Sequence, residues 1–378
     1  MDVNQYPDLN VSSRILLGPG PSMVSPRVLR SMSTPLVGHL DPEFLSLMQD
    51  VQQMLRYVFQ TENELTVPLS GTGSAGMEAS LCNFIEPGDR VLIAVQGYFG
   101  ERLVDMAGRY GAQVDRIDRP WGQVFEPAEI KAALQKARYK LFAIVHAETS
   151  TGALQPGIAE IAAAAHENGA LLVLDTVTSL GGLPVEIDAW DVDIAYSGSQ
   201  KCMSAPPGLA PLTVSPRARE VLRNRKTKVA NWYLDLSMLE KYWGNERTYH
   251  HTAPITMNYA LREALRMVVE EGLEARFARH RAMAERTQSW ALERGLALFA
   301  PAGYRSQTVT TVDNRLNLDV AAINQFLKQR EMRIANGYGP LKNKTFRIAH
   351  MGEIQVEDIE RLISAMDEYL GTIVDYPM

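Results

Sequence analysis

Cysteine is scarce in this sequence of 378 residues, which contains only Cys82 and Cys202. Two thiols are too few for a disulfide framework or a four-thiolate metal site, so we expect a reducing compartment, the cytoplasm. Long apolar runs are missing as well, because no segment approaches the ~20 apolar residues that span a bilayer. Residues 1–14 also lack the basic and apolar segments of a secretory signal. We therefore expect no association with a membrane.

Basic charge is not in excess either. Lys and Arg number 38 against 44 Asp and Glu, which gives a net charge of -6. This balance argues against a general nucleic-acid footprint and favours small ligands. His250 and His251 are adjacent, but they supply neither the ligand count nor the spacing of a zinc site. We expect no nucleic-acid partner and no metal.

What the sequence does contain is an alternation of short apolar runs with helical stretches between residues 65 and 215. This pattern is typical of an α/β fold, in which helices cover a parallel sheet. Ligands of such sheets bind beyond the carboxyl ends of the strands, so the residues after each run are the first candidates for a site. The predicted strands cover residues 65–69, 91–95, 141–145, 171–174 and 194–196.

The pattern changes in the last third of the chain. A helical region with apolar residues at three- and four-residue spacing covers residues 257–294. Predicted strands at 309–312 and 346–348 and helices at 320–330 and 356–370 then indicate a smaller α+β unit. We expect an N-terminal arm (1–20), a large domain (21–262) and a small C-terminal domain (263–378).

A glycine-rich turn follows the first predicted strand of the large domain. Gly71, Gly73 and Gly76 stand in a G-x-G-x-x-G arrangement between a strand and a helix, where free N–H groups attract a phosphate. Thr72 and Ser74 add hydroxyls that suit a terminal monophosphate. A dinucleotide site and a plain tight turn are the alternatives, although the next strand ends in Gln96-Gly97 rather than in the acidic residue that binds ribose.

Asp175 and Lys201 follow neighbouring predicted strands. A carboxylate at a buried strand end needs a cationic partner, and a protonated pyridine nitrogen is such a partner. A lysine amine can carry a pyridine aldehyde cofactor as a Schiff base and afterwards move protons. The alternatives are a helix-capping Asp175 and a solvated Lys201. The pair at neighbouring strand ends favours pyridoxal 5′-phosphate.

Seven motifs in fixed order carry a family resemblance. Together they resemble the class V aminotransferases, and most closely the alanine-glyoxylate and serine-glyoxylate group, from about Leu16 to Gly352. This resemblance implies fold type I, in which the large domain has a mainly parallel seven-stranded sheet. The motifs are LLGPGPS, SGTGSAGMEA, HAETSTGALQP, LDTVTSLGG, YSGSQKCMSAPPG, YHHTAPI and FRIAHMG.

The resemblance also implies roles for individual residues. Lys201 matches the Schiff-base lysine, and Asp175 matches the partner of the pyridine nitrogen. Thr149 matches the contact to the phenolic oxygen, and Phe99 stands where an indole stacks on the ring in the animal enzymes. Ser74 likewise stands where those enzymes have a histidine. The phosphate would be bound by Thr72, Gly73, Ser74 and Gln200, together with Tyr249 and Thr252 from the neighbouring subunit of a homodimer.

Substrate binding is expected at Arg347, which matches the family's carboxylate-binding arginine, and Ser179 is a further candidate contact. The function implied is a ping-pong transamination from alanine or serine to glyoxylate or pyruvate. A cysteine desulfurase-like lyase would need a nucleophilic cysteine in the small domain, and no cysteine follows Cys202. A nucleotide-binding oxidoreductase is a third possibility and lacks the ribose acid.

Overall fold

The five predicted apolar runs and two further strands form one seven-stranded sheet in the computed structural model, which describes residues 1 and 3–373. The strand order is β2-β10-β9-β8-β5-β3-β4, and all neighbours are parallel except that β10 runs antiparallel to β2 and β9. The predicted strands are confirmed, and so is the mainly parallel sheet. The strands are β2 (Leu65–Ser70), β3 (Arg90–Val95), β4 (Gln113–Asp118), β5 (Leu141–Val145), β8 (Leu171–Asp175), β9 (Ile194–Tyr196) and β10 (Leu209–Val214).

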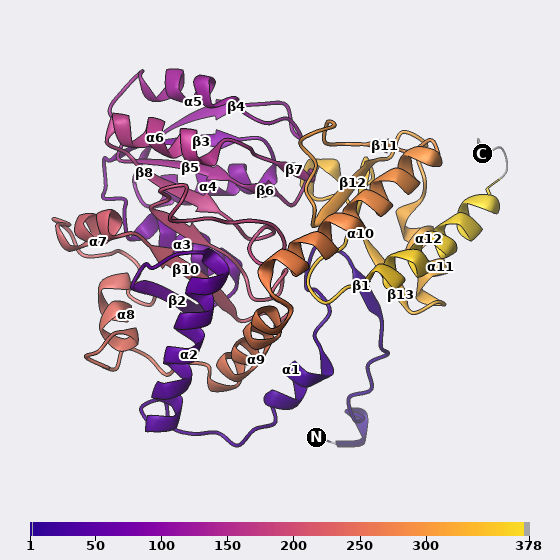
Figure 1. The fold of residues 1–378 in the computed structure, drawn as a ribbon, viewed down its shortest axis with the longest axis horizontal. Coiled ribbons are helices and arrows are strands. Elements are labelled where there is room, and N and C mark those ends of the chain that lie inside the picture. The colour runs from indigo at the N-terminus through magenta and orange to yellow at the C-terminus, as the bar shows by residue number, and fades with distance from the viewer. Residues whose placement is uncertain (2, 374–378) are drawn as a thin grey trace.

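Helices bury both faces of this sheet, as the apolar runs require. Alternate residues of β3 point to opposite sides: Leu92 and Ala94 lie in one apolar cluster, and Val91 and Ile93 lie in the other. Figure 1 shows this large unit on the left of the molecule. Its helices are α1 (Pro26–Ser31), α2 (Pro42–Phe59), α3 (Gly73–Cys82), α4 (Tyr98–Arg109), α5 (Pro127–Leu134), α6 (Ile158–Asn168), α7 (Pro216–Arg223), α8 (Leu236–Trp243) and α9 (Ile255–Glu271).

The smaller unit, on the right of Figure 1, is built on a sheet of order β1-β13-β14-β12-β11. Its edge strand β1 comes from the N-terminal segment and pairs with β13 in parallel, so the arm joins the C-terminal sheet. The elements are β1 (Ile15–Leu17), α10 (Leu273–Glu293), β11 (Ala297–Leu298), β12 (Val309–Asp313), α11 (Val320–Lys328), β13 (Met332–Asn336), β14 (Thr345–Ala349) and α12 (Val356–Gly371); short elements elsewhere are η1 (Val3–Gln5), β6 (Ala147–Glu148), β7 (Ala153–Leu154) and η2 (Gly339–Leu341).

Gly272 separates two helices where the sequence predicted one helical region. Its φ of +80° ends α9, which packs on α1 and α2, and starts α10, which packs on α12 and β12. The packing therefore changes from the large to the small unit at this residue. In the described part of the chain, no helix has both the length and the apolar character that a membrane crossing needs.

Candidate active site

A cavity of about 270 Å³ lies between the large unit, the small unit and the N-terminal segment. It lies at the carboxyl ends of strands in the parallel sheet, where such sheets bind ligands. A larger cleft of about 640 Å³ between α2 and α8 contains none of the predicted site residues. The smaller cavity is lined by Pro19, Gly20, Thr72, Gly73, Ser74, Met77, Phe99, Arg102, Thr149, Asp175, Val177, Gln200, Lys201, Ala335, Tyr338 and Arg347.

Asp175 is the last residue of β8 and its side chain is held at both oxygens. The Tyr196 hydroxyl donates to Oδ2 at 2.7 Å, and the Val177 N–H donates to Oδ1 at 2.9 Å. Burial raises the pKa of Asp175 to about 6, and these hydrogen bonds work in the opposite direction. The carboxylate is thus fixed in direction and has a strong need for a cationic partner.

Lys201 lies in the turn that follows β9, and its side chain reaches the N-terminal segment. The amine donates to the carbonyl of Pro19. Burial lowers the pKa of Lys201 to about 8, and the positive charge of Arg347 acts in the same direction. A sizeable neutral fraction near pH 8 makes this amine a competent nucleophile. Gly20 allows the approach, because a Cβ there would lie 2.7 Å from Nζ at a φ of +106°.

The helix α3 presents an anion site to the cavity. Thr72 is its N-cap, but the Thr72 side chain makes no capping hydrogen bond, so N–H groups of the first turn remain available. The Arg102 guanidinium donates to Ser74 Oγ at 3.2 Å and brings positive charge to the same place. Gln200 Oε1 is buried and has no hydrogen-bond partner among the described residues, but as an acceptor it does not itself bind an anion. The helix N-terminus and Arg102 fit a phosphate.

An aromatic ring faces the cavity from the start of α4. The Phe99 ring is parallel to that of Tyr338, with an interplanar angle of 5° and centroids 6.3 Å apart. Arg102 lies 4.8 Å from the Phe99 centroid. The Phe99 N–H donates to the buried carboxylate of Glu148 at 3.2 Å, which fixes the start of the helix. Phe99 therefore offers a π face to a planar ligand.

Arg347, on β14, is only 7% exposed and brings an unpaired charge to the cavity. Its Nε and Nη2 donate to the carbonyl of Asn336 at 3.1 and 2.9 Å, and Nη1 donates to that of Thr149 at 3.3 Å. No carboxylate lies within salt-bridge distance of it among residues 1 and 3–373, although the buried carboxylate of Glu148 is near enough to act against the lowering of its pKa. Burial lowers the pKa of Arg347 to about 10. A buried cation whose hydrogen bonds go only to carbonyls suits an anionic ligand.

Three predicted residues lie outside the cavity of this chain. Ser179 is buried and its hydroxyl lies 3.0 Å from His146 Nδ1, so it contacts a neighbour of the site and not the cavity. Tyr249 is 52% exposed, and its hydroxyl lies 3.4 Å from that of Thr252, which is exposed too. Neither of these two residues therefore reaches the cavity of its own chain.

Sequence reasoning missed Tyr196, Arg102 and Tyr338. Tyr196 could have been found, because it ends the predicted strand beside Asp175 and the two are register partners. Arg102 lies three residues after Phe99 on one helix face, which is a detectable signal once the helix is placed. Tyr338 lies in a loop, and its approach to Phe99 depends on the packing of the two units. No local signal identifies it.

These residues fit pyridoxal phosphate as a set: a lysine, a carboxylate held at a strand end, a helix N-terminus with free donors, and an aromatic face. The family model "Aminotransferase class-V" matches residues 16–363. A (S)-ureidoglycine–glyoxylate transaminase of Bacillus subtilis is 41% identical over 90% of this chain and 86% of its own. An alanine–glyoxylate aminotransferase of Drosophila melanogaster is 40% identical over 95% and 93%. The crystal structure of an alanine–glyoxylate aminotransferase from Nostoc sp. has a TM-score of 0.93 and 50% identity, covering 98% of this chain and 99% of that one.

Proposed function

This chain belongs to the class-V aminotransferases, which use pyridoxal phosphate, and we propose that it catalyses a transamination to glyoxylate. The amino group would come from a small amino acid, alanine or serine. The observation that carries the proposal is the buried Arg347, which forms no salt bridge with any described residue and lies in the same small cavity as Lys201. Glyoxylate and the small amino acids share one carboxylate beside the reacting carbon. Glyoxylate also occurs in the names of relatives with different amino donors.

(S)-Ureidoglycine is a second candidate donor. The Bacillus subtilis relative that is named for it is as similar to this chain as the alanine–glyoxylate relatives are. Its carboxylate would use the same arginine. The choice of amino donor therefore depends on the residues that line the cavity around Arg347. Activity measured with a panel of amino donors identifies the preferred one.

The residues of the cavity have distinct tasks in the proposed reaction. Bound pyridoxal phosphate supplies an electron sink for the charge left at the α-carbon. Lys201 would hold the cofactor through its amine and would move the proton at the substrate α-carbon. Asp175 would keep the ring nitrogen of the bound cofactor protonated. Arg347 binds the substrate carboxylate in a bidentate fork and so orients the α-carbon.

The Thr149 hydroxyl, which donates to Thr178 Oγ1 at 3.2 Å, is assigned to the phenolic oxygen. The proposal further includes a ping-pong order, a homodimer in which Tyr249 and Thr252 serve the neighbouring site, and a cytoplasmic location. Exposed aromatic side chains at Trp232, Tyr233 and Tyr249 support an interface on this face. Two buried free thiols support a reducing compartment.

The absorption spectrum of the purified protein tests the proposal. The visible band of lysine-bound pyridoxal phosphate should bleach when alanine, serine or (S)-ureidoglycine is added, and should return with glyoxylate. The donor that bleaches the band fastest at low concentration is the preferred one. Lys201→Ala should show neither change while its circular dichroism stays that of the wild type. Normal turnover by this variant, or a band that no donor bleaches, contradicts the proposal.

A further inference from the structure

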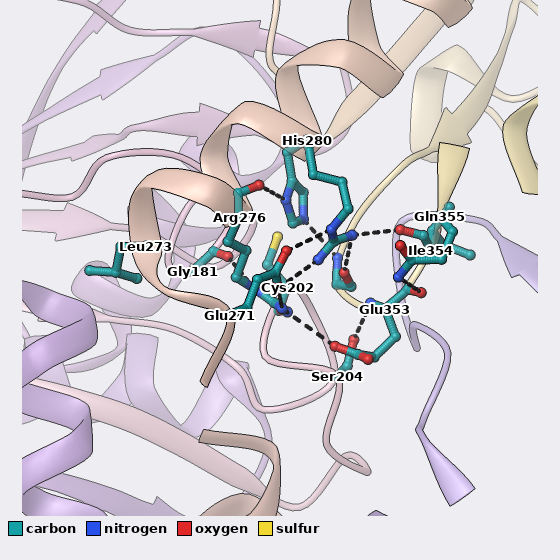
Figure 2. A network of polar contacts seen from close by, with 12 residues as sticks. Gly181, Cys202, Ser204, Glu271, Leu273, Arg276, His280, Glu353, Ile354 and Gln355 are labelled. Atoms are coloured by element: carbon teal, nitrogen blue, oxygen red, sulfur yellow. Dashed lines mark hydrogen bonds and ion pairs between the residues drawn. The ribbon is translucent and has the colours of Figure 1, made fainter. Parts of the chain in front are cut away.

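A buried polar network joins the start of α10 to the turn after Lys201 (Figure 2). At its centre is Arg276, which is 0% exposed. Its Nε donates to the carbonyl of Gly181 at 2.9 Å, and Nη2 donates to that of Cys202 at 2.6 Å. Nη1 donates to Glu271 at 2.5 Å and contacts Glu353 at 3.4 Å. All three guanidinium nitrogens thus have partners, which a buried charge requires.

The same stretch of α10 also holds the segment that follows β14. Arg279 Nη1 donates to the carbonyls of Gly352 and Ile354 at 2.9 and 2.6 Å. His280 Nδ1 lies 2.7 Å from the Arg276 carbonyl, and Nε2 accepts the N–H of Gly352 at 2.9 Å. Burial lowers the pKa of His280, so the neutral ring donates through one nitrogen and accepts through the other. Glu271 accepts from both arginines.

The two held segments also touch directly. The N–H of Ser204 donates to the carbonyl of Lys201 at 2.9 Å, and Ser204 Oγ accepts the N–H of Glu353 at 2.9 Å. Gly352 makes this approach possible, since its φ is +71° and a Cβ there would lie 1.9 Å from Ser204 Oγ. The turn that carries Lys201 is therefore bonded to the segment that follows the strand of Arg347.

We propose that Arg276 is a positioning residue that fixes the Lys201 turn, through the Cys202 carbonyl, relative to the strand that carries Arg347. Arg276 does not line the cavity, so it acts only through the backbone that it holds. The amine and the carboxylate-binding fork belong to different units, and their relative placement decides whether the amine meets the α-carbon. This inference rests on the proposed function, because it takes Lys201 as the cofactor lysine.

The test uses the full chain with Arg276→Met, Arg276→Lys and the control Arg286→Met. Arg286 is also on α10 and pairs with Glu360 of α12 at 2.6 Å, but it does not contact the Lys201 turn. Cofactor-free protein is mixed with pyridoxal phosphate, the lysine adduct is trapped with borohydride at set times, and Lys201 is identified by peptide mapping. The kcat and KM for alanine with glyoxylate are then measured.

In Arg276→Met we expect the trapping rate at Lys201 and kcat to fall roughly 10- to 100-fold, with KM within about threefold of the wild type. Arg276→Lys should fall between, because an ammonium cannot span two carbonyls as a planar fork does. Arg286→Met should match the wild type even if its melting temperature drops. If Arg276→Met does not fold, Arg276→Lys carries the test and wild-type trapping in it overturns the inference. If wild-type protein itself fails to label Lys201, the proposed function is wrong and this inference falls with it.

Discussion

At the scale of residues, one hydroxyl outside the cavity contributes to the protonation state of Asp175. Tyr196 is fully buried, and its O–H donates to Oδ2 of Asp175. Burial raises the pKa of Asp175 to about 6, whereas this hydrogen bond stabilises the charged form. In the proposed reaction the charged form is the one that would keep the nitrogen of the bound cofactor protonated. We therefore expect Tyr196 to extend the pH range in which the site works.

Tyr196→Phe tests this dependence. Loss of a hydrogen bond to a charged group is worth roughly 1.5–3 kcal/mol, so the pKa of Asp175 should rise by at least about one unit. Asp175 then stays neutral to a higher pH, and the acid limb of the profile of kcat against pH should move upward by about that amount. Tyr139→Phe is the control, because Tyr139 donates to Asp115 at 2.8 Å outside the cavity. An acid limb that stays in place would show that Tyr196 only fills space.

Site residues that follow from a local sequence feature could be predicted, whereas those that depend on strand register or on packing could not. Lys201 and Asp175 were predictable because a strand end is a local feature, and the structure brings them to one cavity. Arg347 was predictable from its motif. The bond from Tyr196 to Asp175 depends on strand register, and the contact of Arg102 with Ser74 depends on how α4 packs beside α3. Strand register and helix packing both involve segments far apart in the chain, so the pattern of one segment cannot predict them.

At the scale of elements, β4 and β10 are the two strands of the large sheet that were not predicted. The edge strand β4 has no buried residue and no apolar run. β10 contains Pro211, which lies opposite Pro68 of β2, and proline inside a strand argues against a strand. β10 also returns from β9 without a crossover helix, so it runs antiparallel. The connection between them is the segment that carries Lys201.

The N-terminal end of α3 has a predicted function, phosphate binding, that can be tested apart from catalysis. The phosphate should be bound by its first-turn N–H groups and by Arg102 of α4. Arg102→Met should weaken the binding of pyridoxal phosphate to cofactor-free protein roughly tenfold, since a charge-assisted contact of about 1.4 kcal/mol is lost. The binding of pyridoxal, which has no phosphate, should change by less than about twofold. Spectroscopic titration measures both.

Arg109→Met is the matched control for that titration. Arg109 is on the same helix and pairs with Asp105 at 3.0 Å on the exposed surface. It should leave both affinities unchanged. An equal loss for pyridoxal and pyridoxal phosphate in Arg102→Met would assign Arg102 to the aromatic wall beside Phe99, which it also contacts, and not to the phosphate.

At the scale of the whole molecule, the cavity is lined by the large unit, the small unit and the N-terminal segment, but the two predicted phosphate ligands Tyr249 and Thr252 lie outside it. The N-terminal segment reaches the cavity through Pro19 and Gly20 and then continues into α1, which packs on α9. Tyr249 is exposed on the large unit, and its ring lies 4.9 Å from that of His39. If Tyr249 and Thr252 bind a phosphate, they bind it in another copy of the chain.

Dimers made of two different variants test whether Tyr249 and Thr252 act in the neighbouring subunit. We expect Lys201→Ala and the double variant Tyr249→Ala, Thr252→Val to have little activity alone. A dimer with one subunit of each has one site in which the lysine, the tyrosine and the threonine are all native, provided that the sites are shared. Random exchange makes about half of the dimers mixed, so refolding the two variants together should restore up to about a quarter of the wild-type activity.

The same mixture separates the two arrangements. Were Tyr249 and Thr252 to act in their own subunit, every site of a mixed dimer would lack either the lysine or the phosphate ligands, and activity would stay at the level of the single variants. A mixture of Lys201→Ala with Arg347→Ala is the control. Lys201 and Arg347 line the same cavity of one chain, so each site of that mixed dimer keeps one defect and should remain inactive. Recovery in the first mixture together with none in the second is the result that a shared active site requires.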